Sequence, residues 1–250
     1  MISTLIIAEA GVNHNGSEEL AFKLVDAAID AGVDIIKFQT FKADELVTSA
    51  AKQADYQIKN TEKTQSQWSM LKALELSFDS HMSIKSYCDS KNIEYLSTAF
   101  DLLSLKFLTE SMCLTRLKIP SGEITNAPFV LEHALTGCDI ILSTGMSTLP
   151  EIEFALAVLA YGFINKTEEL APSHNAFVQA YQSKDGQDQL KKKVTLLHCT
   201  TEYPAPFNQV NLKAMDLMAD TFNLPIGYSD HTSGISVSLA AVAREACVIE

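Results

Sequence analysis

Short apolar runs alternate with amphipathic segments along most of the chain. The first apolar run covers residues 4–11, and an amphipathic pattern follows over residues 17–32. Ser17 is placed to cap that pattern and Gly32 to end it, so a strand followed by a helix is predicted. The alternation continues to the last residue. Further strands are predicted at 33–40, 93–100, 116–122, 139–146, 194–200, 224–231 and from 247 on, and further helices at 67–75, 79–89, 102–111, 127–137, 149–163, 211–222 and 234–246.

Two polar stretches interrupt this rhythm. Residues 41–66 show little periodicity, which is typical of a long loop. Residues 164–193 are polar, end in three lysines, and are interpreted as an insertion with one irregular helix around residues 175–181.

The strand pattern predicts the fold class. Continuous apolar strands separated by helices indicate a parallel sheet covered on both faces. Seven strand–helix units and the start of an eighth strand predict a (β/α)8 TIM barrel that occupies residues 1–250 as one domain, with the eighth strand incomplete. An open doubly wound sheet is the alternative, and it is less favoured because no GxGxxG follows the first strand.

Composition narrows the class of protein. A hydrophobic fraction of 47% supports a large core, and a net charge of -12 argues against a nucleic-acid partner. The 5 cysteines form no CxxC pair, which is typical of reduced thiols. No leader pattern and no membrane-length apolar run is present, so a cytoplasmic protein with no membrane association is expected.

Two lysines lie inside apolar strands, close to the strand ends where such barrels carry their chemistry. Burying an unpaired ammonium is costly, so Lys37 and Lys118 need partners. Either lysine alone fits a salt bridge to an interior glutamate as well as it fits ligand binding. Hydroxyls at neighbouring strand ends favour an anion cradle, since phosphate binds to point charges and hydroxyl donors. These hydroxyls belong to Thr98, Ser121, Ser143 and Ser229.

Two carboxylates also stand at strand ends. Glu9 and Glu123 are candidates for proton transfer or for orienting substrate hydroxyls, and a salt bridge to Lys37 or Lys118 is the structural alternative. The two interpretations do not exclude each other.

The histidines divide into groups by position. His231 ends a strand beside acidic and hydroxyl groups, whereas His198 lies within a strand and is expected to be a hydrogen-bonded core residue. His14 follows the first strand, where hydrogen bonding and substrate contact are equally open. Ordinary helix or surface positions are expected for His81, His133 and His174.

The adjacent residues Ser229, Asp230 and His231 have the residue types of a hydrolase triad. Neighbours on a strand point to opposite faces, and a triad is assembled from distant positions, so this hypothesis fails. A strand-end imidazole suits a divalent metal, although one histidine does not make a site.

Seven segments in register resemble the sialic acid synthase (N-acetylneuraminate synthase) family. They read IAEAGVNHNG, IIKFQTFKADEL, YQIKNTEKTQSQ, LKIPSGEITNAPF, ILSTGMSTLPEIE, LLHCTTEYPAPFNQVNL and IGYSDHTSG. The resemblance runs from about residue 5 to residue 250 and is weakest at 164–193. It implies a transferase that joins phosphoenolpyruvate to an N-acetylated hexosamine of the N-acetylmannosamine type. The products are a nine-carbon 2-keto sugar acid and phosphate.

The resemblance also implies a role for each matching residue. Glu123, Glu9 and Lys118 are the implied catalytic residues, with Glu123 handling protons around C2 and C3 of phosphoenolpyruvate. His231 matches a ligand of a divalent metal, Mn²⁺ or Mg²⁺. The implied substrate-binding residues are Lys37, Gln39, Thr98, Ser121, Ser143, Thr201, Tyr203 and Ser229, of which Gln39 and Tyr203, together with Glu9, match positions that hold the open-chain sugar.

The chain departs from the family pattern in three respects. The family has a second metal histidine two positions beyond the glutamate matched by Glu250, and a C-terminal antifreeze-like domain that gives an arginine to the partner's site in a homodimer. Both are absent here, which suggests a fragment or a truncated product. Thr201 stands where some members have asparagine.

Two other functions compete with this hypothesis. One is condensation with a 2,4-diacetamido sugar to give legionaminic or pseudaminic acid, which would use the same anion cradle. The other is a non-catalytic remnant that binds phosphate compounds without turnover.

Overall fold

The computed structural model describes residues 4–48, 51, 66–165 and 171–250. Its strands follow one another in chain order in a closed parallel barrel, which confirms the predicted (β/α)8 fold. The strands are β1 (Leu5–Gly11), β2 (Ile35–Thr40), β3 (Glu94–Ala99), β4 (Arg116–Ile119), β5 (Asp139–Ser143), β6 (Val194–Cys199), β7 (Ile226–Ser229) and β8 (Val248–Ile249).

The chain divides into two compact units. Ala8–Cys113 form one, called here the N-terminal unit, and Leu114–Glu250 with the residues up to Ile7 form the other, the C-terminal unit.

In the N-terminal unit, helices pack against β2 and β3, and polar caps fix where the helices begin. Ser17, Ser77 and Asp101 each accept a backbone N–H of the first turn that follows them, which satisfies a donor with no partner inside the helix. The helices are α1 (Glu18–Asp30), α2 (Ala43–Leu46), α4 (Gln67–Leu74), α5 (Phe78–Ser90) and α6 (Leu102–Lys106), the last followed by a π-helical turn at Phe107–Ser111.

The register of β2 and β3 separates a polar face from an apolar one. Lys37 lies opposite Leu96 and Gln39 opposite Thr98, so these side chains share one face. The other face carries Phe38, whose ring stacks on Tyr95 at 5.4 Å between centroids. This apolar face meets α5 through a hydrogen bond between His81 and Tyr95.

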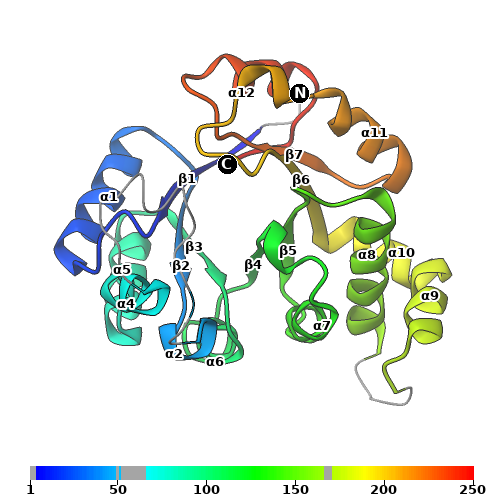
Figure 1. The fold of residues 1–250 in the computed structure, drawn as a ribbon, viewed down its shortest axis with the longest axis horizontal. Helices are drawn as coiled ribbons and strands as arrows, with labels where there is room; N and C mark the ends of the chain where they lie inside the picture. The colour runs from blue at the N-terminus through cyan, green and yellow to red at the C-terminus, as the bar shows by residue number, and fades with distance from the viewer. Residues whose placement is uncertain (1–3, 49–50, 52–65, 166–170) are drawn as a thin grey trace. The chain divides into compact units, whose positions relative to one another are not determined.

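In the C-terminal unit, a bundle of helices surrounds the long apolar helix α8. The residues of α8 from Ala155 to Phe163 are buried, and α7, α9 and α10 all pack against this helix (Figure 1). The helices are α7 (Ala127–Leu135), α8 (Leu149–Ile164), α9 (His174–Gln182), α10 (Lys184–Lys193), α11 (Lys213–Phe222) and α12 (Ser236–Ala243), with 3-10 turns at Ser121–Glu123 and Phe207–Gln209.

Two predictions about the polar stretches are wrong. Residues 171–193 form two regular helices: α9 lies where one irregular helix was predicted, and α10 was not predicted. Phe177 of α9 packs edge-on against Tyr161 of α8 at 5.0 Å. The stretch predicted as a loop at 41–66 contains helix α2, and residues 49–50 and 52–65 lie outside the described residues.

The strands of the C-terminal unit also have two faces. Lys118 lies opposite Ile141, Ser143 opposite Leu197, and Cys199 opposite Ser229, so that these side chains share one face. We call it the Lys118 face. The opposite face is apolar and carries Ile119, Leu142, Leu196 and Ile226. No helix in the described part of the chain is long and apolar enough to cross a membrane.

His81 and His133 lie on helices α5 and α7, in agreement with the helix positions expected for them, but neither is at the surface. Both side chains are almost completely buried, because their helices turn them toward the core. Burial lowers the pKa of His81 to about 3 and that of His133 to about 4, so both imidazoles stay neutral in the folded protein.

We therefore expect stability to fall as the pH decreases below about 6.5. Unfolded histidine takes up a proton below its ordinary pKa of 6.5, whereas folded His81 does so only near 3. The contribution of His81 to the free energy of unfolding is therefore complete above pH 6.5. It falls by up to about 1.4 kcal/mol per pH unit as the pH decreases further. Urea unfolding at several pH values measures the slope.

His81→Phe should reduce that slope, while His174→Phe, at an exposed position, should leave it unchanged. An equal slope in the wild type and the His81→Phe variant would contradict this prediction.

Candidate functional site

Lys118 is the central cation of the C-terminal unit. Its side chain is almost fully buried, and Nζ lies 3.5 Å from Oε2 of Glu250, whose side chain is equally buried. The backbone N–H of Glu250 donates to Tyr228, which holds the carboxylate at the end of β8. The sequence placed Glu250 at a strand end but gave it no role. Its pairing with Lys118 is visible only once β4 and β8 are folded.

Polar groups surround this ion pair on the Lys118 face. Ser143 and Ser229 are buried, and the thiol of Cys199 lies among them. Burial raises the pKa of Cys199, against the opposing influence of Lys118 and of hydrogen bonds with Gly145 and Ser143. We call Lys118, Ser143, Cys199, Ser229 and Glu250 the Lys118 cluster. It offers an ammonium and hydroxyl donors, which suit an anion such as phosphate.

Gly145 lets the segment after β5 approach the end of β6. A Cβ at this position would lie 2.7 Å from Cγ2 of Thr201 and 2.8 Å from Sγ of Cys199. Both distances are shorter than atoms tolerate, so the absence of a side chain at Gly145 sets the positions of Thr201 and Cys199.

The 3-10 turn after β4 carries two further predicted residues. Ser121 and Glu123 are both half-buried. Asn126, which caps α7, donates from Nδ2 to Oε2 of Glu123 at 2.8 Å. The carboxylate of Glu123 is therefore held in place on the turn.

The loops after β6 and β7 bring Tyr203 and His231 together. Their ring centroids are 4.4 Å apart, and the backbone N–H of Ala205 donates to the carbonyl oxygen of His231 at 2.8 Å. Tyr203 is exposed and His231 is half-buried. The structure thus joins two residues that the sequence assigned to different roles.

The predicted metal has incomplete support. His231 is a suitable ligand, but both oxygens of Asp230 accept hydrogen bonds from Thr232 and Ser238. Among residues 4–48, 51, 66–165 and 171–250, no three His, Cys, Asp or Glu side chains form a group able to hold a metal ion. These residues do not by themselves make a metal centre. The Mn²⁺ or Mg²⁺ ligand role of His231 stays a prediction.

In the N-terminal unit, Lys37 forms an ion pair with Glu9. Gly11 lies beside both Glu9 and Gln39: a Cβ on Gly11 would be 2.8 Å from Oε1 of Glu9 and 3.6 Å from Nε2 of Gln39. Thr98 shares the face of Gln39. Four predicted residues of this unit therefore lie on one side of its strands.

The remaining histidines have structural roles. Nδ1 of the buried His14 accepts the backbone N–H of Gly16 at 3.0 Å, which fits the hydrogen-bonding alternative, and burial lowers the pKa of His14. Nε2 of His198 lies 2.7 Å from the carbonyl oxygen of Val210, so the predicted hydrogen-bonded histidine is confirmed.

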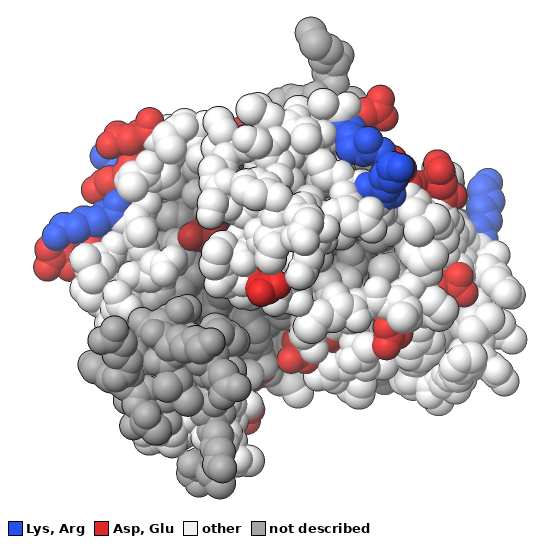
Figure 2. Space-filling model, turned by 45° about the horizontal axis from the view of Figure 1, so that its top comes forward, with Lys and Arg blue, Asp and Glu red and all other residues white. Residues whose placement is uncertain are grey.

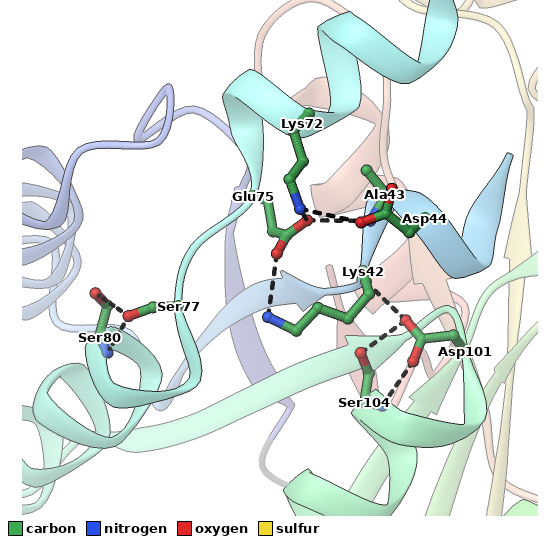
Figure 3. A network of polar contacts seen from close by, with 9 residues as sticks. All are labelled: Lys42, Ala43, Asp44, Lys72, Glu75, Ser77, Ser80, Asp101 and Ser104. Carbon is green, nitrogen blue, oxygen red and sulfur yellow. Dashed lines mark hydrogen bonds and ion pairs between the residues drawn. The ribbon is translucent and has the colours of Figure 1, made fainter. Parts of the chain in front are cut away.

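A polar network at the end of β2 was not foreseen from the sequence (Figure 3). Glu75 accepts hydrogen bonds from the ammonium groups of Lys42 and Lys72 and from the N–H of Ala43, each at 3.1 Å. Asp101 accepts the N–H of Lys42 at 2.8 Å. Desolvation opposes ionisation of Glu75, but these donors outweigh it and lower the pKa of its carboxyl. The network fixes the segment that follows Gln39 and Thr40.

The face drawn in Figure 2 shows no large basic patch among the described residues. On the face drawn in Figure 2, the basic and acidic side chains of the described residues lie in small groups among uncharged ones. Lys37 and Lys118, by contrast, are buried.

Comparison with known proteins identifies the family. A family model described as the NeuB family matches residues 24–250. The chain belongs to the NeuB family. The predicted resemblance to the sialic acid synthases is thereby confirmed.

Two relatives of known name are similar over the whole chain. The chain is 50% identical over 250 residues to an N,N'-diacetyllegionaminic acid synthase of Campylobacter jejuni, matching 100% of this chain and 67% of that protein. It is 46% identical over 249 residues to a protein of the same name from Legionella pneumophila, matching 100% of this chain and 63% of that one. The chain therefore spans about two thirds of the length of these NeuB relatives.

A solved structure shows the same fold. It is the N-acetylneuraminic acid (sialic acid) synthetase of Leptospira borgpetersenii, which is 30% identical with a TM-score of 0.77. The match covers 99% of this chain and 72% of that one.

The close approach at Gly145 generates a prediction. Gly145→Ala should lower the free energy of unfolding by about 1–3 kcal/mol, because the new methyl group overlaps Thr201 and Cys199. Gly122→Ala is the matched control, since nothing lies within 4 Å of the Cβ it would add. Urea denaturation compares the two variants. Equal stability of both would show that the β6 end tolerates a side chain at residue 145.

Proposed function

We propose that the chain catalyses the condensation of phosphoenolpyruvate with a 2,4-diacetamido hexose, giving a nine-carbon 2-keto acid of the N,N'-diacetyllegionaminic type and phosphate. The supporting observation is the identity of 50% and 46% to two synthases of that name, against 30% to the sialic acid synthetase. The first expectation from the sequence, a sugar of the N-acetylmannosamine type, is supported less well than its legionaminic alternative. The preference rests on similarity over all of the chain.

The proposed reaction forms one carbon–carbon bond and releases one phosphate. C3 of phosphoenolpyruvate attacks the aldehyde carbon of the open-chain sugar, whose oxygen takes a proton and becomes a hydroxyl. Water adds to the cationic C2 and loses a proton. The C2–O bond to phosphate then breaks, the new C2 hydroxyl gives its proton to the departing phosphate, and its oxygen becomes the keto oxygen of the product.

The Lys118 cluster is the proposed phosphoenolpyruvate site of the C-terminal unit. The ammonium of Lys118 and the hydroxyls of Ser143 and Ser229 are buried on one face, where an electrostatic contact is stronger than in water. Preorganised donors of this kind stabilise the charge that develops as phosphate leaves. Ser121 follows Lys118 closely along the chain, and Thr201 follows Cys199. Both are proposed to contact the same substrate.

Glu123 is the proposed proton carrier at C2 and C3. Its side chain is half-buried and fixed by Asn126, which leaves it able to exchange a proton with bound water. In the N-terminal unit, Lys37 is the second proposed cation. Glu9 and Gln39 are proposed to bind sugar hydroxyl and acetamido groups. No step here passes through the predicted metal.

A substrate panel tests the proposed sugar. With phosphoenolpyruvate and Mn²⁺ present, phosphate release should be fastest with a 2,4-diacetamido hexose and at least about tenfold slower with N-acetylmannosamine, because a site built to bind an acetamido group discriminates against its absence. Faster turnover of N-acetylmannosamine would restore the first expectation. If neither of the two sugars supports phosphate release, the result would count against the proposed activity.

Removing the cation of the cluster tests the anion site. Lys118→Ala should weaken phosphoenolpyruvate binding about 10- to 150-fold, since a charged hydrogen-bonding group contributes about 1.5–3 kcal/mol. Calorimetric titration measures it, with exposed Lys192→Ala as the control.

Lys118→Ala also leaves Glu250 buried without this partner, which destabilises the fold. The double variant Lys118→Ala/Glu250→Gln relieves that charge and should still bind weakly. Wild-type affinity in the folded double variant would remove Lys118 from the proposed site.

A further inference from the structure

Asp230 joins the end of β7 to the helix that follows it. One carboxylate oxygen accepts the backbone N–H of Thr232 at 2.8 Å and its hydroxyl at 2.7 Å. The other oxygen accepts the hydroxyl of Ser238, in helix α12, at 2.6 Å. The backbone N–H of Asp230 donates to Glu250 at 2.8 Å. A single side chain therefore closes the loop that carries His231.

That loop is also fixed to the preceding one. The carbonyl oxygen of His231 accepts the N–H of Ala205 at 2.8 Å, and the ring of Tyr203 lies 4.4 Å from the imidazole. The ring of Tyr203 is 57% exposed and lies against the imidazole of His231 in this contact. A displacement of His231 would therefore disturb its contact with Tyr203, and the hydrogen bonds of the adjacent Asp230 oppose such a displacement.

We propose that Asp230 is a positioning residue for amino-sugar binding, which it supports by holding the Tyr203–His231 ring pair in one arrangement. This inference rests on the proposed function. Asp230 touches no substrate in this scheme. It acts through the loop, and its carboxylate suits the task because it accepts several hydrogen bonds at once and needs to donate none.

Substitution of Asp230 should change the KM values for the two substrates to different extents. Misplacing a binding group by about 1 Å costs up to about 100-fold, so Asp230→Ala should raise the KM for the diacetamido sugar about 10- to 100-fold. The KM for phosphoenolpyruvate should change less than about twofold, because the Lys118 cluster stays intact. A general loss of folding would affect both substrates alike, and circular dichroism checks the fold.

Two further variants test whether the change in KM comes from the lost hydrogen bonds of Asp230. Asp230→Asn keeps the oxygen that binds Thr232 and should restore most of the wild-type KM. Asp220→Ala, at an exposed position of α11, is the matched control and should behave as the wild type. An Asp230→Ala enzyme with a wild-type KM for the sugar would overturn the inference.

A second measurement does not depend on activity. The NMR signal of the His231 ring protons, assigned with the Tyr203→Leu variant, reports the ring contact at a fixed pH. In Asp230→Ala it should move toward its position in Tyr203→Leu, and in Asp220→Ala it should not move. An unmoved signal in Asp230→Ala contradicts the inference even if the chain turns over no sugar, whereas a moved signal without turnover would count against the proposed function alone.

Discussion

The burial of lysine ammonium groups on the strands is the constraint on which the rest of the structure depends. Lys118 is almost completely removed from water, and the carboxylate of Glu250, 3.5 Å away at the end of another strand, compensates its charge. Strand alternation makes this arrangement compatible with a stable core, since Leu117 and Ile119 on either side of Lys118 point to the opposite, apolar face. The same strand that contributes Leu117 and Ile119 to the core thus also carries a buried ion pair.

Several residues that bind no ligand in the proposed reaction fix the loops and strand ends around the predicted site residues. Gly145 leaves room for Thr201 and Cys199 at the end of β6, and Asp230 fixes the loop of His231 to α12 and to Glu250. In the N-terminal unit, Glu75 fixes the segment after β2 in the same manner. Such contacts place polar side chains on a rigid frame, which electrostatic catalysis requires.

The periodic parts of the chain were predicted well, and the errors fall where packing decides. Hydrophobic periodicity identified every strand, because each alternates or runs apolar over several residues. A helix was predicted at α9 but not at α10, because the packing of α10 on α8 stabilises a segment whose polar composition conceals it. His81 was assigned to an ordinary position because nothing in its neighbours shows that α5 turns it inward against Tyr95.

The sequence alone determined the barrel, the family, and the residue types at the strand ends, because strand periodicity and ordered motifs are local properties. Only the tertiary structure decided the partners: Lys118 with Glu250, Asp230 with Ser238, and Tyr203 with His231. These pairs join different strands, loops and helices, and their geometry follows from strand register and loop path. A single sequence does not encode such distances in any local pattern.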